Sequence, residues 1–530
     1  MPDHEAHATP GQNRLMSPKA ALSVANGVLG AVLGTTALVY IAQNMGPGTL
    51  GILGYAMISI GLLSFLSDFG VGSVHSMHMR TCPDQAKCIG AYAAIRLALV
   101  AIFAVVTYFL IELWKDGFIG GPMPSDDTML EPLIDSMYVF LVYYVLLGIS
   151  QIATHTFDAV DAVARVHVPA ILEIVVRVSF VIYIATSALG STTSGPALLA
   201  SAYAAGMISS ILLIAVLMMR YRISKPDREI LMKYIHSLVP VFLVSIIIIL
   251  DLYLDKAVVG YFWGEYELGL YFGVQKMAVF VSVFSLAVAT LILPSVTTYF
   301  IRKDVGASWD VVNQAERYVS LVVVPTAAFY LMYGGDIIRV FLENEFVQAV
   351  RTMDMLVLSS AVFALVLPLR SAIVGVGEPK KLLSIGAVGL LIQLVLLLVL
   401  VPDDFFGMNM LGMRGEGAAV VLLVSATYYF FALRYMVWKT GKILPSSRSF
   451  KHIISAVTMV GAMYVVDWFI IPTVDWAALV LLAVVGVLSY GASAYSMGEL
   501  ESSDYRYFRS LLNPQETYQY VVNELLGKRM

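Results

Sequence analysis

The side chains of this chain that could do chemistry are charged residues inside long apolar segments. They are Asp68, Arg96, Glu173, Arg177, Asp251, Asp255, Lys256, Lys276 and Arg370. A charge at the centre of a membrane helix costs roughly 2.5–3.5 kcal/mol on insertion scales, so such groups normally face a partner or a watery cavity. Buried cations can hold a phosphate, and neighbouring carboxylates suit the binding of a proton or a sodium ion.

Three cations are candidates for an anion-binding cavity: Arg96, Arg177 and Lys276. Arg96 lies about two turns inside the basic end of its segment. There it either lines a cavity or extends to the lipid headgroups. Arg177 follows Glu173 by four residues, so the two share a helix face. They either neutralise each other, or Arg177 exchanges Glu173 for an anionic substrate.

The carboxylates Asp251 and Asp255, with the adjacent Lys256, form a second group. Asp251 and Asp255 share a helix face, which suits coupling to H⁺ or Na⁺. The alternative is a static charge network with Lys276. Asp68 and Arg370 lie nearer the basic ends of their segments, where solvation of a helix terminus accounts for a charge.

One loop contains His75, His78, Cys82 and Cys88. Four such side chains can ligate zinc, but Pro83 interrupts the run and the spacing is not a standard one. Two cysteines are too few for a disulfide framework, and we expect reduced thiols and no metal here. The chain has no P-loop, nucleophile elbow or H-E-x-x-H motif. We therefore expect a protein that is not an enzyme and binds no cofactor.

The segments around these residues are membrane helices. Charged residues make up 13% of the chain and apolar residues 59%, against about 25% and 45–50% in soluble domains, so the surface must face lipid. The apolar runs lack the alternation of a β-barrel. The predicted fold is an all-α polytopic bundle of about 14 transmembrane helices. The predicted spans are 20–44, 49–74, 89–113, 133–157, 168–189, 197–219, 237–262, 268–298, 318–342, 351–376, 382–401, 415–438, 452–471 and 476–497.

Lys and Arg concentrate in the loops on one side of this topology, and both termini belong to that side. The positive-inside rule therefore predicts a multi-pass protein with both termini in the cytoplasm. The longest external loop, Trp114–Pro132, is too short for a catalytic domain. A net charge of −4 suggests no nucleic-acid partner.

The chain also contains an internal repeat. Gly46–Gly51 and Gly264–Gly269 both read G-x-x-x-L-G at an external turn, each between the first two spans of a six-span half. An even number of spans per half makes the repeat parallel, a known plan of transporters. The predicted organisation is a cytoplasmic N-terminal segment (1–19), a first six-helix lobe (20–219), a basic linker (220–236), a second six-helix lobe (237–438), two additional helices (452–497) and a cytoplasmic tail (498–530).

Several motifs resemble those of Wzx-type polysaccharide flippases of the MOP superfamily. They are the G-P-G-x-x-G turn and S-D-F-G-V-G within 46–72, L-D-K-A-V-V-G at 254–260, L-G-L-Y at 268–271, G-V-G-E-P-K-K at 375–381 and G-E-G-A-A at 415–419. They follow the family order over about residues 20–440. The tail 498–530 and the His/Cys loop have no counterpart in this resemblance.

The resemblance implies export of a polyprenyl or dolichyl (di)phosphate that carries a sugar chain, by alternating access of two six-helix lobes. Its partners would be this lipid-linked glycan, membrane lipids and a coupling ion, H⁺ or Na⁺. Arg96, Arg177 and Lys276 would hold the anionic headgroup, and Asp255 and Lys256 match a family motif. A MATE-type cation antiporter of the same superfamily is the alternative. A membrane glycosyltransferase would need larger external loops, and a passive channel or scaffold would not need the repeat.

Overall fold

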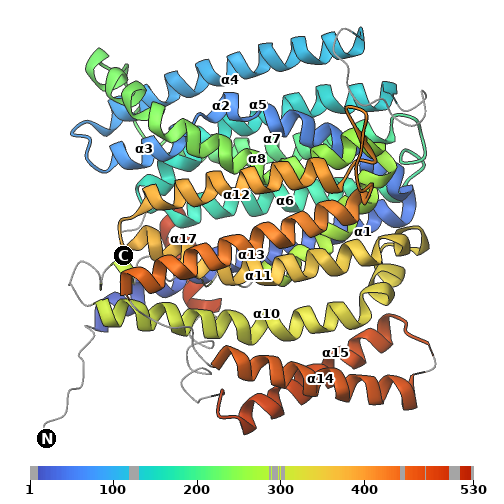
Figure 1. Ribbon diagram of the computed structural model, residues 1–530. Helices are drawn as coiled ribbons and strands as arrows, with labels where there is room; N and C mark the ends of the chain where they lie inside the picture. The colour runs from blue at the N-terminus through green and yellow to red at the C-terminus, as the bar shows by residue number, and fades with distance from the viewer. Residues whose placement is uncertain are drawn as a thin grey trace, which may run out of the picture.

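The chain is a bundle of long helices that run roughly side by side (Figure 1). The computed structural model describes residues 10–117, 130–283, 285, 288, 296, 297, 299, 305–441, 448–471, 473–500 and 514–526. These residues include 11 helices long and apolar enough to cross a membrane, or up to 12 if one bent pair counts as a span. The predicted all-α membrane bundle is therefore confirmed.

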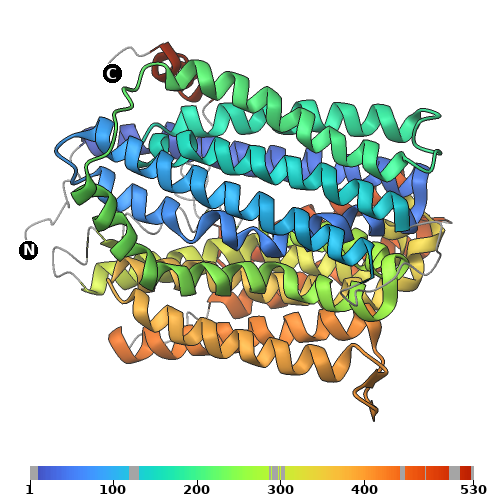
Figure 2. The same cartoon turned by 90° about the horizontal axis from the view of Figure 1, so that it is seen from above.

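The helices form two lobes, which occupy opposite sides of the bundle in Figure 2. The first lobe consists of α1 (Pro10–Leu63), α2 (Phe65–Asp68), α3 (Val71–Met79), α4 (Gln85–Lys115), α5 (Leu130–Ala159), α6 (Val163–Thr186) and α7 (Gly195–Met218). The second consists of α8 (Arg228–Val279), η2 (Phe280–Ser282), α10 (Val305–Phe341), η3 (Asn344–Ala349), α11 (Val350–Gly375), α12 (Pro379–Leu400) and α13 (Arg414–Gly441).

Three further helices follow the lobes. They are α14 (Arg448–Ile470), α15 (Trp476–Ser496) and α17 (Pro514–Leu526). The pair α14–α15 packs against α10, whereas α17 packs against α1 and α6 of the first lobe. The start of α1 and α17 lie at one end of the bundle, which we call the terminal face (Figures 1 and 2).

Two glycines divide helices that are too long for one crossing. The stretch Ala21–Met79 has 59 residues, about 90 Å of helix against a hydrocarbon core of about 30 Å. Gly46 (φ 73°, ψ 178°) interrupts it, and Gly264 (φ 77°, ψ −172°) interrupts α8 in the same way. This region of φ/ψ space is strongly disfavoured for residues with a side chain. Division at both glycines gives the predicted 14 spans.

The two G-x-x-x-L-G motifs pack on each other, which supports the predicted repeat. A Cβ at Gly51 would lie 1.7 Å from the carbonyl oxygen of Glu265. A Cβ at Gly269 would lie 1.9 Å from the carbonyl oxygen of Pro47. The last glycine of each motif thus contacts the backbone of the other motif's second residue. This reciprocal contact is what a pseudo-twofold axis between the halves requires.

The second span is broken, although the sequence predicts one helix over 49–74. Phe69 (φ 46°) and Gly70 (φ 74°) adopt the left-handed conformation between α2 and α3. The break falls within the S-D-F-G motif. It leaves Asp68 at the end of α2, where its side chain is 34% exposed.

Helices extend further than the sequence predicts at the terminal face. The linker predicted at 220–236 is helical from Arg228, and α10 begins at Val305 rather than near residue 318. Helix propensity carries these helices beyond the apolar core, where hydropathy gives no signal. A hairpin of β1 (Asp404–Phe405) and β2 (Met408–Asn409), which is not predicted, joins α12 and α13, with Asp404 opposite Asn409.

Some predictions fall on residues outside the described ranges. They concern residues 1–9 of the N-terminal segment, most of the loop Trp114–Pro132, much of the end of the span 268–298, and tail residues 501–513 and 527–530.

Candidate interlobe anion site

The pair Glu173–Arg177 lies on α6, as the spacing predicts. Arg177 Nε donates to Glu173 Oε1 at 2.7 Å, and the two side chains are 17% and 13% exposed respectively. The guanidinium carbon also lies 4.7 Å from the ring centre of Tyr203 on α7. The pair therefore neutralises itself in this state, while an aromatic face supports the cation.

Lys276 of α8 is the cation that the second lobe contributes. Its ammonium lies 5.3 Å from the ring centre of Phe272, and its side chain is exposed. Among the residues that the structure describes, none is recorded as a carboxylate partner of Lys276. The ring of Phe272 in turn lies 3.6 Å from the Cβ position of Gly54 on α1, so Lys276 lies where α8 packs on the first lobe.

Tyrosines that were not predicted as site residues line the junction between the lobes. The rings of Tyr143 and Tyr203 lie 5.8 Å apart, and those of Tyr143 and Tyr144 lie 5.2 Å apart. Tyr144 Oη and Tyr253 Oη of the second lobe are hydrogen-bonded at 3.1 Å. The signal available in the sequence was the pair Tyr143–Tyr144 at the middle of a span, away from the interfacial belts.

Asp255 belongs to a buried network within α8. The carboxylate is 1% exposed and accepts hydrogen bonds from Lys256 Nζ (3.0 Å), Tyr271 Oη (2.7 Å) and Gln275 Nε2 (2.9 Å). The static network that the sequence suggested therefore exists, with Tyr271 and Gln275 in place of Lys276. Since each partner stabilises the charged carboxylate, this arrangement favours the structural role of the L-D-K motif.

Asp251 faces a different space. It lines a cavity of about 280 Å³ between α8, α11, α12 and α13, together with Arg370 and Tyr429. The remaining lining is mainly aliphatic, including Ile247, Val366 and Leu382. Asp251 and Asp255 thus point to separate environments, although they lie one turn apart.

Arg96 is buried in a clamp rather than extended to the headgroups. Its side chain is 1% exposed. It donates from Nη1 to Asp68 Oδ1 at 2.6 Å, from Nε to the Gly148 carbonyl at 3.1 Å, and from Nη2 to Gln151 Oε1. The clamp joins the broken second span to α4 and α5. In this state each of the three guanidinium nitrogens donates to a protein oxygen.

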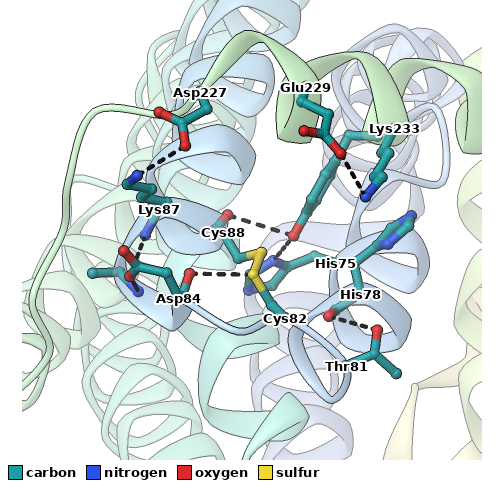
Figure 3. Close-up of a disulfide and its surroundings, with 12 residues drawn as sticks. His75, His78, Thr81, Cys82, Asp84, Lys87, Cys88, Asp227, Glu229 and Lys233 are labelled. Atoms are coloured by element: carbon teal, nitrogen blue, oxygen red, sulfur yellow. Dashed lines mark hydrogen bonds and ion pairs between the residues drawn. A yellow bond between two sulfur atoms is a disulfide. The ribbon is translucent and has the colours of Figure 1, made fainter.

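The His/Cys loop holds a disulfide, which corrects the expectation of free thiols. Cys82 and Cys88 are bonded to each other, and both ring nitrogens of His75 are occupied, by Tyr234 Oη (3.0 Å) and Thr156 Oγ1 (3.1 Å). Figure 3 shows the disulfide, which joins Cys82 of the loop to Cys88 in the first turn of α4, with His75 and His78 beside it. The described residues contain no group of three or more His, Cys, Asp or Glu side chains fit for a metal. The separation of six residues permits this bond, although thiols on the cytoplasmic side of a membrane are normally reduced.

The terminal face is closed between the lobes. The rings of Phe69 and Phe242 stack at 4.3 Å, and a Cβ at Gly70 would lie 2.4 Å from Val241 Cγ1. His78 Nε2 pairs with Ser237 Oγ at 3.0 Å. The break of the second span therefore packs directly on the start of α8.

Residues 19–300 match the model of a family described as polysaccharide biosynthesis protein. This match covers more than half of the chain. The chain belongs to this family. The resemblance predicted from the sequence motifs is confirmed, and membership agrees with the two-lobed membrane fold. No curated protein sequence matches the chain.

Solved structures of the MOP superfamily share the fold. The lipid II flippase MurJ, in an inward closed conformation, aligns with a TM-score of 0.72 at 14% identity, over 90% of this chain and 98% of its own. An inward-facing MATE family multidrug transporter aligns with a TM-score of 0.54 at 17% identity, over 81% and 98%. A MOP superfamily transporter from Pyrococcus furiosus gives 0.55 at 16%, over 81% and 97%. These likenesses establish the fold that this family member adopts.

Proposed function

We propose that the protein is a flippase for lipid-linked oligosaccharides, which moves a polyprenyl or dolichyl (di)phosphate carrying a glycan by alternating access of its lobes. The observation that carries the proposal is that each lobe holds a cation against an aromatic ring near the lobe junction, Arg177 at Tyr203 and Lys276 at Phe272, in a chain of the polysaccharide biosynthesis family. The fold shared with the lipid II flippase MurJ supports it.

Phosphate recognition follows from the charges at this junction. Among the described residues, no carboxylate forms an ion pair with the ammonium of Lys276, so it is available to a phosphate. Arg177 can exchange Glu173 for a phosphate oxygen. Charge-assisted hydrogen bonds of this kind are about twice as strong as neutral ones. Since each lobe supplies one cation, relative motion of the lobes changes the distance between them and hence the affinity for the headgroup.

Arg96 would join this site only after release of Asp68. In the present state Asp68, Gly148 and Gln151 occupy its donors. We propose that it acts mainly by fixing the broken second span against α4, and that contact with substrate is confined to states in which the break rearranges.

The cavity that Asp251, Arg370 and Tyr429 line is the proposed place of ion coupling. A carboxylate there can take up H⁺ or Na⁺ while the guanidinium adjusts its distance. Asp255 is fully hydrogen-bonded and is assigned to the structural network. In the cell the protein would lie in the cytoplasmic membrane with the terminal face on the cytoplasmic side, as the excess of Lys and Arg in the loops there supports.

Reconstitution into proteoliposomes with a fluorescent polyprenyl-diphosphate oligosaccharide tests the function. We expect wild-type protein to move the lipid, and Arg177→Ala and Lys276→Ala each to reduce the rate at least about tenfold, the loss of one charge-assisted contact of about 1.5 kcal/mol. Lys276→Arg keeps the charge and should retain most transport. Arg339→Ala is the matched control, because Arg339 is 54% exposed and pairs only locally with Asp336.

A MATE-type antiporter is the competing function, which the carboxylate of Asp251 favours. The same liposomes, loaded with an organic cation and given a pH gradient, distinguish the two. Cation efflux that Asp251→Asn abolishes, without movement of the lipid-linked glycan, would replace the flippase proposal.

A further inference from the structure

The hairpin between α12 and α13 has a turn that one of its residues does not favour. Phe406 (φ 53°) and Gly407 (φ 77°) are the two residues between β1 and β2, and both adopt positive φ. A two-residue turn with positive φ at both positions usually contains Asn or Asp followed by Gly, because a bulky side chain is disfavoured in the left-handed region. Gly407 fits this pattern, whereas Phe406 does not. Strained residues of this kind cluster at functional positions, which draws attention to the ring of Phe406.

The tip of the hairpin exposes apolar side chains. Phe406 is 88% exposed, Met408 is 56% exposed and Leu411 is 62% exposed. The acidic side chain nearest to them is used within the hairpin, because Asp404 Oδ1 accepts from the backbone N–H of Gly407 at 3.2 Å. The tip therefore presents three large apolar side chains, whose contact with water is unfavourable.

A series of aromatic rings connects this tip to the exposed surface of α8. The rings of Phe406 and Phe405 lie 4.6 Å apart, and those of Phe405 and Phe262 lie 6.1 Å apart. The ring of Phe262 in turn lies 5.0 Å from that of Tyr261, whose side chain is 54% exposed. Aromatic side chains concentrate where a membrane helix passes from hydrocarbon to water. The base of the hairpin therefore lies at this boundary.

The base of the hairpin is fixed to the end of α12. The backbone N–H of Met413 donates to the Leu400 carbonyl at 2.8 Å, and Trp263 Nε1 of α8 donates to the Val401 carbonyl at 2.9 Å. Figure 2 shows the hairpin, in orange, projecting beyond α12 and α13 across the helix axes rather than along them, at the end of the bundle opposite the terminal face. Because the helices cross the membrane, an arm in this direction lies along the membrane surface.

We propose that the β1–β2 hairpin is an arm that binds the lipid surface at this end of the bundle, with Phe406 and Met408 inserted among the headgroups. The occupant of the apolar tip is thus the phospholipid interface itself. The direction of the arm and its continuity with the aromatic series of α8 favour a bilayer over a protein partner, since the bilayer already surrounds the adjacent helices. Transfer of the exposed apolar side chains out of water stabilises the bound arm.

Insertion of the tip fixes the adjoining ends of α12 and α13 relative to the membrane plane. These two helices line the cavity that contains Asp251 and Arg370, through residues such as Gly386 and Tyr429. Motions of the second lobe that tilt α12 and α13 therefore require the tip to slide along the interface or to leave it. The arm does not depend on the proposed transport activity, because it requires only that these helices span a membrane.

Spin labelling of the full chain in phosphatidylcholine nanodiscs tests the arm. The native cysteines are bonded to each other and take no label, so a nitroxide is attached through Met408→Cys. We expect this label to collide with oxygen dissolved in the lipid and to be shielded from a water-soluble nickel chelate. Phe406→Asn keeps the turn, which Asn suits, but removes the apolar ring. It should raise collision with the chelate about tenfold, the factor by which burial of one large apolar side chain shifts an equilibrium.

A label attached through Asn344→Cys is the matched control. Asn344 lies in η3 and is exposed, so its label should stay open to the chelate in every variant. Phe406→Trp should preserve the shielding at position 408. Equal access of the chelate to positions 408 and 344 would place the hairpin in water and overturn the proposal. Shielding from both reagents together with spin–spin broadening would assign the contact to a second copy of the chain, and shielding that Phe406→Asn leaves unchanged would show that Phe406 is not inserted; either result would also overturn it.

Discussion

Gly51 and Gly269 occupy equivalent positions in the two halves and meet at the crossing of α1 and α8, where each leaves room for the backbone of the other half. A Cβ at either position would lie within 2.0 Å of a carbonyl oxygen, of Glu265 or Pro47. Side chains can move aside but crossing backbones cannot, so this contact sets how closely the lobes approach.

Alanine at either glycine should therefore destabilise the protein. We expect Gly51→Ala and Gly269→Ala each to cost about 1–3 kcal/mol or more, because overpacking here must displace a whole helix. The thermal unfolding midpoint in detergent measures the effect. Gly27→Ala, at a helical position with no atom near its Cβ, is the control and should be neutral or slightly stabilising. Equal midpoints for all variants would show that the lobes do not touch here.

The clamp around Arg96 should be essential for stability. Arg96→Met leaves the Gly148 carbonyl without its donor and Asp68 without its cation, at a cost of about 3 kcal/mol, since one partner of the pair is partly exposed. Unfolding by denaturant in mixed micelles measures it. Arg339→Met, in an exposed pair, should change stability by less than about 1 kcal/mol. A double variant, Asp68→Leu with Arg96→Met, should recover part of the loss; no recovery would mean that the carboxylate is not the main partner.

The disulfide makes a prediction about thiol chemistry. Cys82 and Cys88 are the only cysteines of the chain, so protein isolated under thiol-blocking conditions should bind no alkylating reagent until it is reduced. Mass spectrometry before and after reduction reads this directly. The double substitution Cys82→Ser, Cys88→Ser should lower stability by about 2 kcal/mol, as expected for a short loop. Alkylation without prior reduction would show free thiols, as cytoplasmic exposure of this loop would favour.

The ion pairs of the buried Glu499 with Arg317 of α10 and Lys451 of α14 should depend on pH. Burial raises the pKa of Glu499, but hydrogen bonds and charges from Lys451 and Arg317 outweigh it and lower the pKa below its ordinary value of 4.5. Because the folded pKa is lowered, the contribution to stability is complete above the unfolded pKa and is lost as pH falls through the folded one. Limited proteolysis of the tail should therefore accelerate below about pH 4.5. In Glu499→Gln the tail should be cleaved fast already at pH 7, at a rate nearly independent of pH. If the variant shows the same pH dependence of cleavage as the wild type, a group other than Glu499 is responsible for it.

Most of the membrane architecture could be predicted from the sequence, because hydropathy and glycine-rich turns are local signals. The long apolar helices and the pair Glu173–Arg177 depend on residues a few positions apart, and the structure contains both. The reciprocal contact of the two G-x-x-x-L-G motifs supports the predicted repeat. The assignment of Arg177 and Lys276 as cations that bind the headgroup follows from the family resemblance and stays a prediction.

The remainder depended on contacts between distant segments. The partner of Arg96 lies 28 residues away across a break at Phe69, a residue whose left-handed conformation nothing in its type suggests. The backbone N–H of Arg165, at the start of α6, donates to Glu524 of a helix at the far end of the chain. The disulfide was not predicted because cytoplasmic thiols are normally reduced, although a separation of six residues allows the two cysteines to meet.

The opening stretch of α8 belongs to the first lobe in packing but to the second in sequence. A bend of 50° separates Arg228–Leu238 from the rest of the helix. Tyr234, in the first part, is buried among Val71, Val74 and Tyr92. If the chain were cut at residue 219, the first fragment would expose the surface that Tyr234 covers. The second fragment would begin with a helical segment, Arg228–Leu238, that lacks its packing partners. Each half therefore needs the other to bury this surface. A split at residue 219 should yield fragments that assemble only when co-expressed.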